Sequence, residues 1–167
     1  LKIKLQLKKH VIHLKYNIKY TKMTIPELVK QGFKLFCIMR PSDKYKQGID
    51  LDFTDELEDR SVPGVYILSN SKQEILKIGQ SSDLYTRFDR MYKSITNTTN
   101  DKVRAYVKDR YNINVYVLPL EPIQEVFKLG DQKILLETSF ASNLEKHLLT
   151  KYKNDIGSLP ILNSGLM

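Results

Sequence analysis

Residues 63–92, PGVYILSNSKQEILKIGQSSDLYTRFDRMY, decide the fold of this chain. Two short apolar segments flank a run of turn-forming residues, Asn70–Gln73, and this pattern predicts a β-hairpin. Because side chains alternate between the two faces of a strand, four aliphatic residues should share one face: Val65, Ile67, Leu76 and Ile78. That face can pack on a hydrophobic core.

The opposite face of the predicted hairpin carries unusual residues. If the four turn residues form the loop, pairing outward from them sets Tyr66 opposite Lys77 and Gly64 opposite Gly79. All four then lie on the face away from the aliphatic side chains. A purely structural hairpin does not need a phenol, an amine and two glycines there, so we expect a functional site on this face.

An amphipathic helix should follow the hairpin. Ser82 can cap it, and Leu84, Phe88 and Met91 recur at helical spacing. Arg87 lies about 60° around the helix from Leu84, at the edge of the apolar stripe. Its guanidinium group can therefore reach over the open face of the hairpin.

The remaining elements are expected in chain order. Before the hairpin we predict a helix at 24–32 that begins at Thr24, a strand or buried segment at 33–39, and an acidic loop over 42–62 with a short helix near 54–59. After it we predict a basic helix at 101–111, a strand at 113–117, a helix or irregular segment up to 129, a turn into the apolar run 134–136, and a last helix at 139–152.

Three segments are expected along the chain: residues 1–22, an N-terminal extension at 23–62 made of a helix and an acidic loop, and a domain at 63–167. Residues 1–22 alternate lysine with aliphatic residues. They are either a basic strand or nucleic-acid arm, or a non-native upstream segment before a natural start at Met23. Both hypotheses remain open.

The net charge of +8 comes mainly from the first segment. Residues 1–22 hold seven of the 27 lysines and arginines and none of the 19 acidic residues, so the remainder has 20 basic residues against 19 acidic ones. Any nucleic-acid surface of the folded part must therefore come from local clustering, such as the seven basic residues between Arg87 and Arg110. The acidic run Asp50–Asp59 is interpreted as a solvated surface or as a docking site for a basic partner.

Composition excludes several classes. With Cys37 as its one cysteine, the chain has neither an internal disulfide nor a multi-cysteine zinc site. No apolar run reaches the roughly 18 residues that a membrane span needs, and no signal peptide is recognisable. We expect a soluble intracellular protein without membrane contact, cytoplasmic or, if viral, inside the host cell.

The last predicted helix contains a carboxylate among apolar residues. Glu145 projects within the arc of its apolar stripe, which consists of Ala141, Leu144, Leu148, Leu149 and Tyr152. A carboxylate on a buried side is costly unless it meets a cation, a metal or several donors. Ser142 and Glu145 also match a capping box, in which Glu145 would only hold its own helix end. The sequence leaves both explanations open.

Taken together, these residues resemble the GIY-YIG nuclease family. The resemblance covers about residues 63–163 and consists of five elements in the family's order: Gly64-Val65-Tyr66, Lys77-Ile78-Gly79 with lysine in place of the second tyrosine, Gln80–Leu84 leading to Arg87, Glu145 in a late helix, and Asn163. The KIG form is similar to that of bacteriophage, mobile-element and large-virus proteins and of some small restriction enzymes. The implied fold is α+β, a small antiparallel three-stranded sheet flanked by helices, here with an N-terminal extension.

The resemblance implies a DNA endonuclease that hydrolyses phosphodiester bonds with one divalent metal ion. Glu145 would be the ligand of Mg²⁺ or Mn²⁺, and Arg87 would hold the phosphate. Tyr66 and Lys77 would activate the attacking water, and which of them is the base stays open, since both free side chains titrate near pH 10. Asn163 would orient the site by hydrogen bonds.

The resemblance also indicates how the substrate is bound. Gly79, Gln80 and Arg90 are expected to contact DNA, and a homodimer would allow cleavage of both strands. The alternative function is a catalytically inactive nucleic-acid-binding module on the same scaffold.

Overall fold

The core of the fold is an antiparallel sheet with the strand order β2-β1-β5-β3-β4. Its strands are β1 (Lys34–Pro41), β2 (Ile49–Phe53), β3 (Gly64–Ser69), β4 (Ile75–Ser81) and β5 (Ile113–Pro119). The structure, a computed structural model, describes residues 22–45, 48–54, 62–91, 101–109, 111–129 and 132–163, without the side chains of 91, 125, 127–129 and 132–138.

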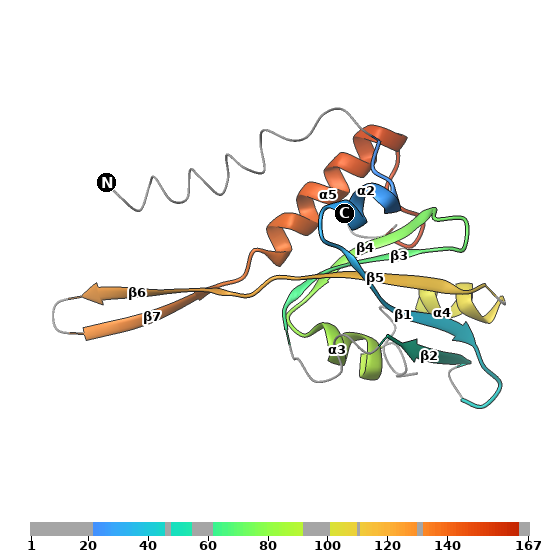
Figure 1. The fold of residues 1–167 in the computed structure, drawn as a ribbon, viewed down its shortest axis with the longest axis horizontal. Coiled ribbons are helices and arrows are strands. Elements are labelled where there is room, and N and C mark those ends of the chain that lie inside the picture. The colour runs from blue at the N-terminus through green and yellow to red at the C-terminus, as the bar shows by residue number, and fades with distance from the viewer. Residues whose placement is uncertain are drawn as a thin grey trace.

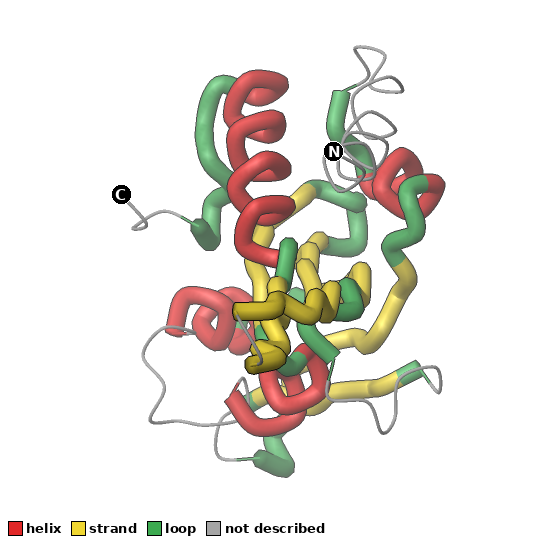
Figure 2. Tube along the Cα trace, turned by 90° about the vertical axis from the view of Figure 1, so that its left-hand side faces the viewer, coloured by secondary structure: helices red, strands yellow, loops and turns green. Residues whose placement is uncertain are grey.

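Helices cover both faces of this sheet. They are α2 (Ile25–Lys30), α3 (Leu84–Thr86), the π-helical turn η2 (Arg87–Met91), α4 (Asp101–Lys108) and α5 (Ala141–Ile156). Figure 1 shows α2 and α5 on one side of the strands and α3 and α4 on the other, and Figure 2 shows helices above and below the strands from a second direction. The expected α+β class, with helices flanking an antiparallel sheet, is confirmed.

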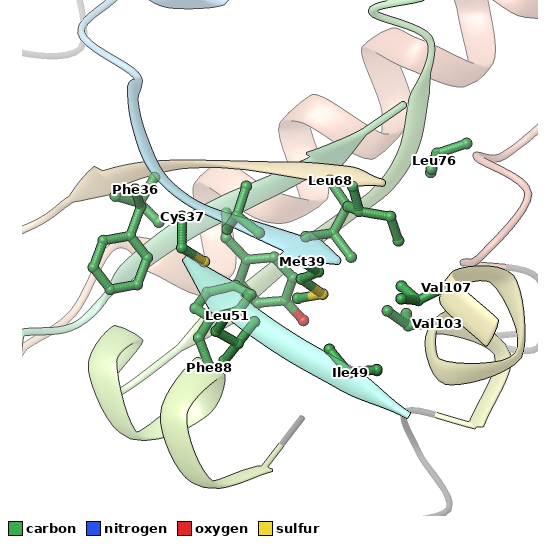
Figure 3. Close-up of a cluster of buried hydrophobic side chains, with 14 of the residues drawn as sticks. Phe36, Cys37, Met39, Ile49, Leu51, Leu68, Leu76, Phe88, Val103 and Val107 are labelled. Atoms are coloured by element: carbon green, nitrogen blue, oxygen red, sulfur yellow. The ribbon is translucent and has the colours of Figure 1, made fainter. Parts of the chain in front are cut away.

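Each helical layer closes one hydrophobic core. On the side of α3, η2 and α4 the core includes Phe36, Met39, Phe88 and Val103 (Figure 3). On the other side α2 and α5 pack on the sheet through a second set, which includes Ile25, Leu28, Val65, Ile67, Ile78 and Leu148. Strands β3 and β4 are buried on both faces, so both helical layers pack on the hairpin even though β4 is the edge strand of the sheet.

The predicted start of the first helix is confirmed, whereas that of the second needs correction. Thr24 caps α2, and its hydroxyl oxygen accepts from the Glu27 N–H at 3.4 Å. The helix after the hairpin is capped by Asp83 and not by Ser82, because the Asp83 carboxylate accepts from both the N–H and the hydroxyl of Thr86, at 2.8 and 2.7 Å.

The predicted register of the hairpin is wrong by two residues. Tyr66 pairs with Gly79 and Leu68 with Lys77, while Gly64 pairs with Ser81. A shift of two preserves the face of every residue, so Tyr66, Lys77 and both glycines still share one face, as expected.

Two local features cause this shift. Asn70 organises a longer loop, because its side-chain oxygen accepts from the N–H groups of Lys72 and Glu74, both at 3.0 Å. The register also slips near the turn, and Leu76 is the residue that it leaves unpaired. As a result Leu76 packs in the core of Phe88, and Ile75 takes its expected place beside Ile78.

The sheet is larger than the expected three strands. β1 agrees with the strand expected at 33–39, whereas β2 comes from the predicted acidic loop, and both join the sheet through pairing of β1 with β5. The expected helix or irregular segment before 129 is also corrected: β6 (Ile123–Leu129) pairs with β7 (Gln132–Thr138) as a separate ribbon that extends away from the rest (Figure 1).

Some of the predicted segments cannot be compared with the structure. The segment 1–21, the short helix near 54–59, most of the acidic run and the basic residues Lys93 and Arg110 lie outside the described residues. Among the residues that are described, no helix has the length and apolar character of a membrane span.

The free edge of β4 is covered by the C-terminal segment. The side-chain oxygen of Asn163 accepts from the Ile78 N–H at 2.8 Å, and its amide donates to the Ile78 carbonyl at 2.7 Å. Beside it, the Leu162 N–H donates to the Leu76 carbonyl at 2.9 Å. Through these two bonds Asn163, which is 3% exposed, takes the place of a neighbouring strand for Ile78.

We expect Asn163→Leu to lower the free energy of unfolding by about 2–4 kcal/mol, because both backbone groups of Ile78 lose their partner without a change in side-chain size. Denaturant unfolding measures this change. Asn154→Leu, at an exposed position of α5, is the control and should change stability by less than about 0.5 kcal/mol. Equal effects of the two substitutions would contradict the assignment.

Candidate active site

Tyr66 lies at the centre of β3 and is 3% exposed. Its ring packs edge-to-face on Phe88, with the ring centroids 5.1 Å apart and the planes at 85°. The ring also crosses Gly79 on the neighbouring strand, where a Cβ atom would overlap it. The glycine of the second motif is therefore needed to seat the phenol, and this close approach fixes where Tyr66 can point.

Lys77 projects from β4 on the same face as Tyr66 and is 7% exposed. Burial lowers the pKa of its amine from the ordinary value, and the nearby Arg87 guanidinium lowers it further. Glu145 opposes these effects, while Lys102 on α4 adds to them. The Lys77 amine is therefore influenced by the Arg87 cation and by the Glu145 carboxylate.

Glu145 reaches the same place from α5. The capping-box explanation is wrong, because α5 begins at Ala141 with Phe140, and not Ser142, at its N-cap. The Glu145 carboxylate instead accepts a hydrogen bond from the backbone N–H of Gln80 on β4. The helix side chain is thus anchored to the edge of the hairpin and not to its own N-terminus.

The charges around Glu145 form one cluster. Burial raises the pKa of the Glu145 carboxyl, and the positive charges of Lys77 and then Arg87 counteract this rise. Lys146 and the Gln80 N–H also favour the ionised form. Since the same charges act on Lys77, these three side chains from β4, η2 and α5 share one electrostatic environment.

Arg87 is half-buried at the first position of η2. Its Nε atom is buried and has no hydrogen-bond acceptor among the residues that the structure describes. A buried guanidinium N–H without an acceptor is costly, and such groups are common where a ligand supplies the acceptor. The charge and the fork of donors suit a phosphate oxygen.

The other predicted residues lie around this cluster in different ways. Asn163 holds Ile78, one residue from Lys77, as described above. Gln80 is half-buried and contributes its backbone N–H to Glu145, while Arg90 is an exposed residue of η2. The structure brings together the side chains of Lys77, Arg87 and Glu145, with Tyr66 on the same face of the hairpin as Lys77.

The residues fit a metal ion that takes most of its ligands from substrate and water. Within the described ranges, no three His, Cys, Asp or Glu side chains gather into a protein cage. Mg²⁺ commonly binds one or two carboxylates together with substrate phosphates and waters. Glu145 supplies such a carboxylate, and its charge interacts with that of Arg87, whose buried Nε has no acceptor among the described residues.

Two contributions were not found from the sequence. The Gln80 N–H positions Glu145, but a backbone donor at a sheet edge leaves no mark in the residue pattern. Phe88 was expected only as part of the apolar stripe, yet it also packs edge-to-face on the ring of Tyr66. Its position next to Arg87 is the feature that could have indicated this.

Known proteins resemble this chain in fold and not in sequence. No protein-family model and no curated protein sequence matches it. Among solved structures, restriction endonuclease HPY188I in complex with product DNA aligns at 18% identity over 87% of this chain and 88% of its own, with a TM-score of 0.50.

A second solved structure, a mutant of bacteriophage T4 EndoII, aligns at 12% identity over 80% of this chain and 98% of its own, with a TM-score of 0.55. At such identities the likeness is one of backbone architecture. The chain therefore has the fold that these two proteins share.

Proposed function

We propose that this protein is a DNA endonuclease that hydrolyses phosphodiester bonds with one divalent metal ion. The observation that carries the proposal is that Lys77, Arg87 and Glu145, from three separate elements, act on one another's charge, with Glu145 beside Gln80 on β4 and an acceptor-free buried Nε on Arg87. Their arrangement has little structural use, because each charge costs desolvation. The fold shared with restriction endonuclease HPY188I and with T4 EndoII supports the same assignment.

The protein groups have separable roles in this proposal. Arg87 binds a non-bridging oxygen of the scissile phosphate, which gives its buried Nε an acceptor. Tyr66 and Lys77 position the attacking water and accept its proton, with either side chain as the base. Asn163 holds β4 in place through Ile78, so that Lys77 keeps its direction.

Glu145 holds the metal ion in this proposal, with Mg²⁺ or Mn²⁺ as the ion. When bound, the ion would stabilise negative charge on the phosphate and on the leaving oxygen. The Gln80 N–H keeps the carboxylate turned toward the hairpin. Burial of the carboxylate also limits how many waters compete for it.

We infer further that the chain belongs to the GIY-YIG nucleases with a KIG second motif, since Gly64, Tyr66, Lys77 and Gly79 occupy one face of the hairpin. The nuclease domain proposed at 63–167 then uses β1 and β2 as additional strands of its sheet. Gln80 and Arg90 remain proposed substrate contacts, whereas Gly79, which was expected to contact DNA, is buried beneath the ring of Tyr66. Cleavage of both strands would need a dimer or two successive encounters.

We expect Mg²⁺ to support nicking of supercoiled plasmid DNA and EDTA to stop it. Glu145→Gln should reduce the rate about 10³-fold, since losing metal assistance costs several kcal/mol. Arg87→Lys should reduce it about 10²-fold, because lysine keeps the charge but lacks the fork of donors. Gel quantification of the nicked form measures both.

Glu121→Gln, at an exposed position, is the control and should cleave like the wild type. Equal cleavage by the wild type and Glu145→Gln would exclude Glu145 as the metal ligand. DNA binding by the wild type without cleavage of any substrate would favour the inactive binding module.

A second prediction concerns the cost of keeping Lys77 in the site. Since the folded pKa of Lys77 is below its unfolded value, protonation of this amine opposes folding, fully so below the folded pKa. Lys77→Met should therefore be as stable as the wild type or more stable at pH 7, although it should not cleave DNA.

The stability advantage of Lys77→Met should shrink as pH rises, because the wild type regains stability between the folded and the unfolded pKa of Lys77. Thermal unfolding from pH 7 to 10 measures the difference, with Lys72→Met in the exposed hairpin turn as the control. A variant that is much less stable than the wild type at pH 7 would contradict this account.

A further inference from the structure

A groove runs along α5 next to the candidate site. It is bounded by the helix on one side and by the chain segment that returns from the end of the helix on the other. Its lining consists of Lys146, Leu149, Thr150, Lys153, Leu159 and Asn163. None of the roles proposed above uses the two lysines.

Two residues that line the groove, Lys146 and Asn163, link it to the neighbourhood of the candidate site. Lys146 directly follows Glu145, and its charge acts on the Glu145 carboxylate. Asn163 lines the groove and also holds the edge of β4 at Ile78. A chain-like ligand with one phosphate at Arg87 and Glu145 could therefore continue into the groove.

The groove has the chemistry of a nucleic-acid backbone site. Lys146, Thr150 and Lys153 are exposed and follow one another at helical spacing on one face of α5. Leu149 and Leu159 are half-buried and give the groove apolar walls. The two ammonium groups suit phosphate oxygens, while the apolar walls suit the carbon surface of sugars. The Thr150 hydroxyl already donates to the Lys146 carbonyl at 2.9 Å.

The spacing of the lysines also suits this ligand. Lys146 and Lys153 are seven residues apart, which corresponds to about 10 Å along the helix axis. Phosphates of one strand follow at about 3.4 Å along the axis of a duplex. The two lysines thus match phosphates about three nucleotides apart when helix and duplex are roughly aligned.

We propose that this groove binds the backbone of the DNA strand that continues from the scissile phosphodiester, with Lys146 and Lys153 each neutralising one phosphate. The placement relative to the cut rests on the proposed function, whereas the binding does not. Charge complementarity and continuity with the edge of β4 are the grounds for choosing DNA as the occupant.

The test is binding of a short DNA duplex in EDTA, so that cleavage plays no part. Affinity is measured by fluorescence anisotropy across a series of KCl concentrations. Each lost lysine–phosphate contact lowers the slope of log affinity against log salt by about one. The double variant Lys146→Gln/Lys153→Gln should therefore lose about two units of slope relative to the wild type.

The control removes the same charge elsewhere. Lys44→Gln/Lys72→Gln replaces two exposed lysines, one after β1 and one in the hairpin turn, and should keep the wild-type slope. Equal slopes for the groove variant and the wild type would overturn the proposal. An equal loss in the control would also overturn it, because the effect would then be one of net charge.

A second measurement separates this proposal from the proposed function. Duplexes are shortened toward the cut from either end. The difference in affinity between the groove variant and the wild type should disappear when one end is shortened and persist when the other is. If the groove variant has the reduced salt slope but the wild type cleaves no DNA, the nuclease function is refuted and the groove assignment stands. If the wild type cleaves DNA and the groove variant has the wild-type salt slope, the groove assignment is refuted and the nuclease function stands.

Discussion

A strand at the edge of a sheet carries backbone N–H and C=O groups that need partners, and β4 obtains them from the C-terminal part of the chain. Asn163 bonds both groups of Ile78, Leu162 bonds Leu76, and Glu145 accepts from Gln80. The edge is thereby closed against strand addition. The contact of Glu145 with Gln80 also belongs to the candidate site, so the covered edge of β4 and the candidate site share a residue.

The candidate site joins the two helical layers of the molecule. Tyr66 and Lys77 face the layer of η2 and α4, whereas Glu145 arrives from α5 in the other layer and reaches around the edge of β4. A central strand could not be approached in this way from both sides. The position of β4 at the edge of the sheet is therefore what allows charges from β4, η2 and α5 to meet.

Much of the hairpin could be predicted from the sequence, because period-2 alternation fixes the face of Tyr66, Lys77 and Gly79 whatever the exact register. The register itself depended on the loop around Asn70 and on a bulge, which alternation does not encode. Strand β2 was hidden by its acidic residues, although Ile49 and Leu51 alternate with them and are buried. The role of Glu145 stayed open because it depends on where α5 begins, and helix ends are set by tertiary contacts.

The central claim is that Glu145 at the edge of β4 is the ligand of the catalytic metal. Addition of Mn²⁺ to the ¹⁵N-labelled protein, followed by amide NMR spectra, tests it most directly, since a paramagnetic ion broadens the nearest signals first. The account predicts that the amide of Gln80, which bonds the Glu145 carboxylate, is among the first to broaden and is spared in Glu145→Gln. Selective broadening elsewhere, or unchanged broadening in Glu145→Gln, would contradict it.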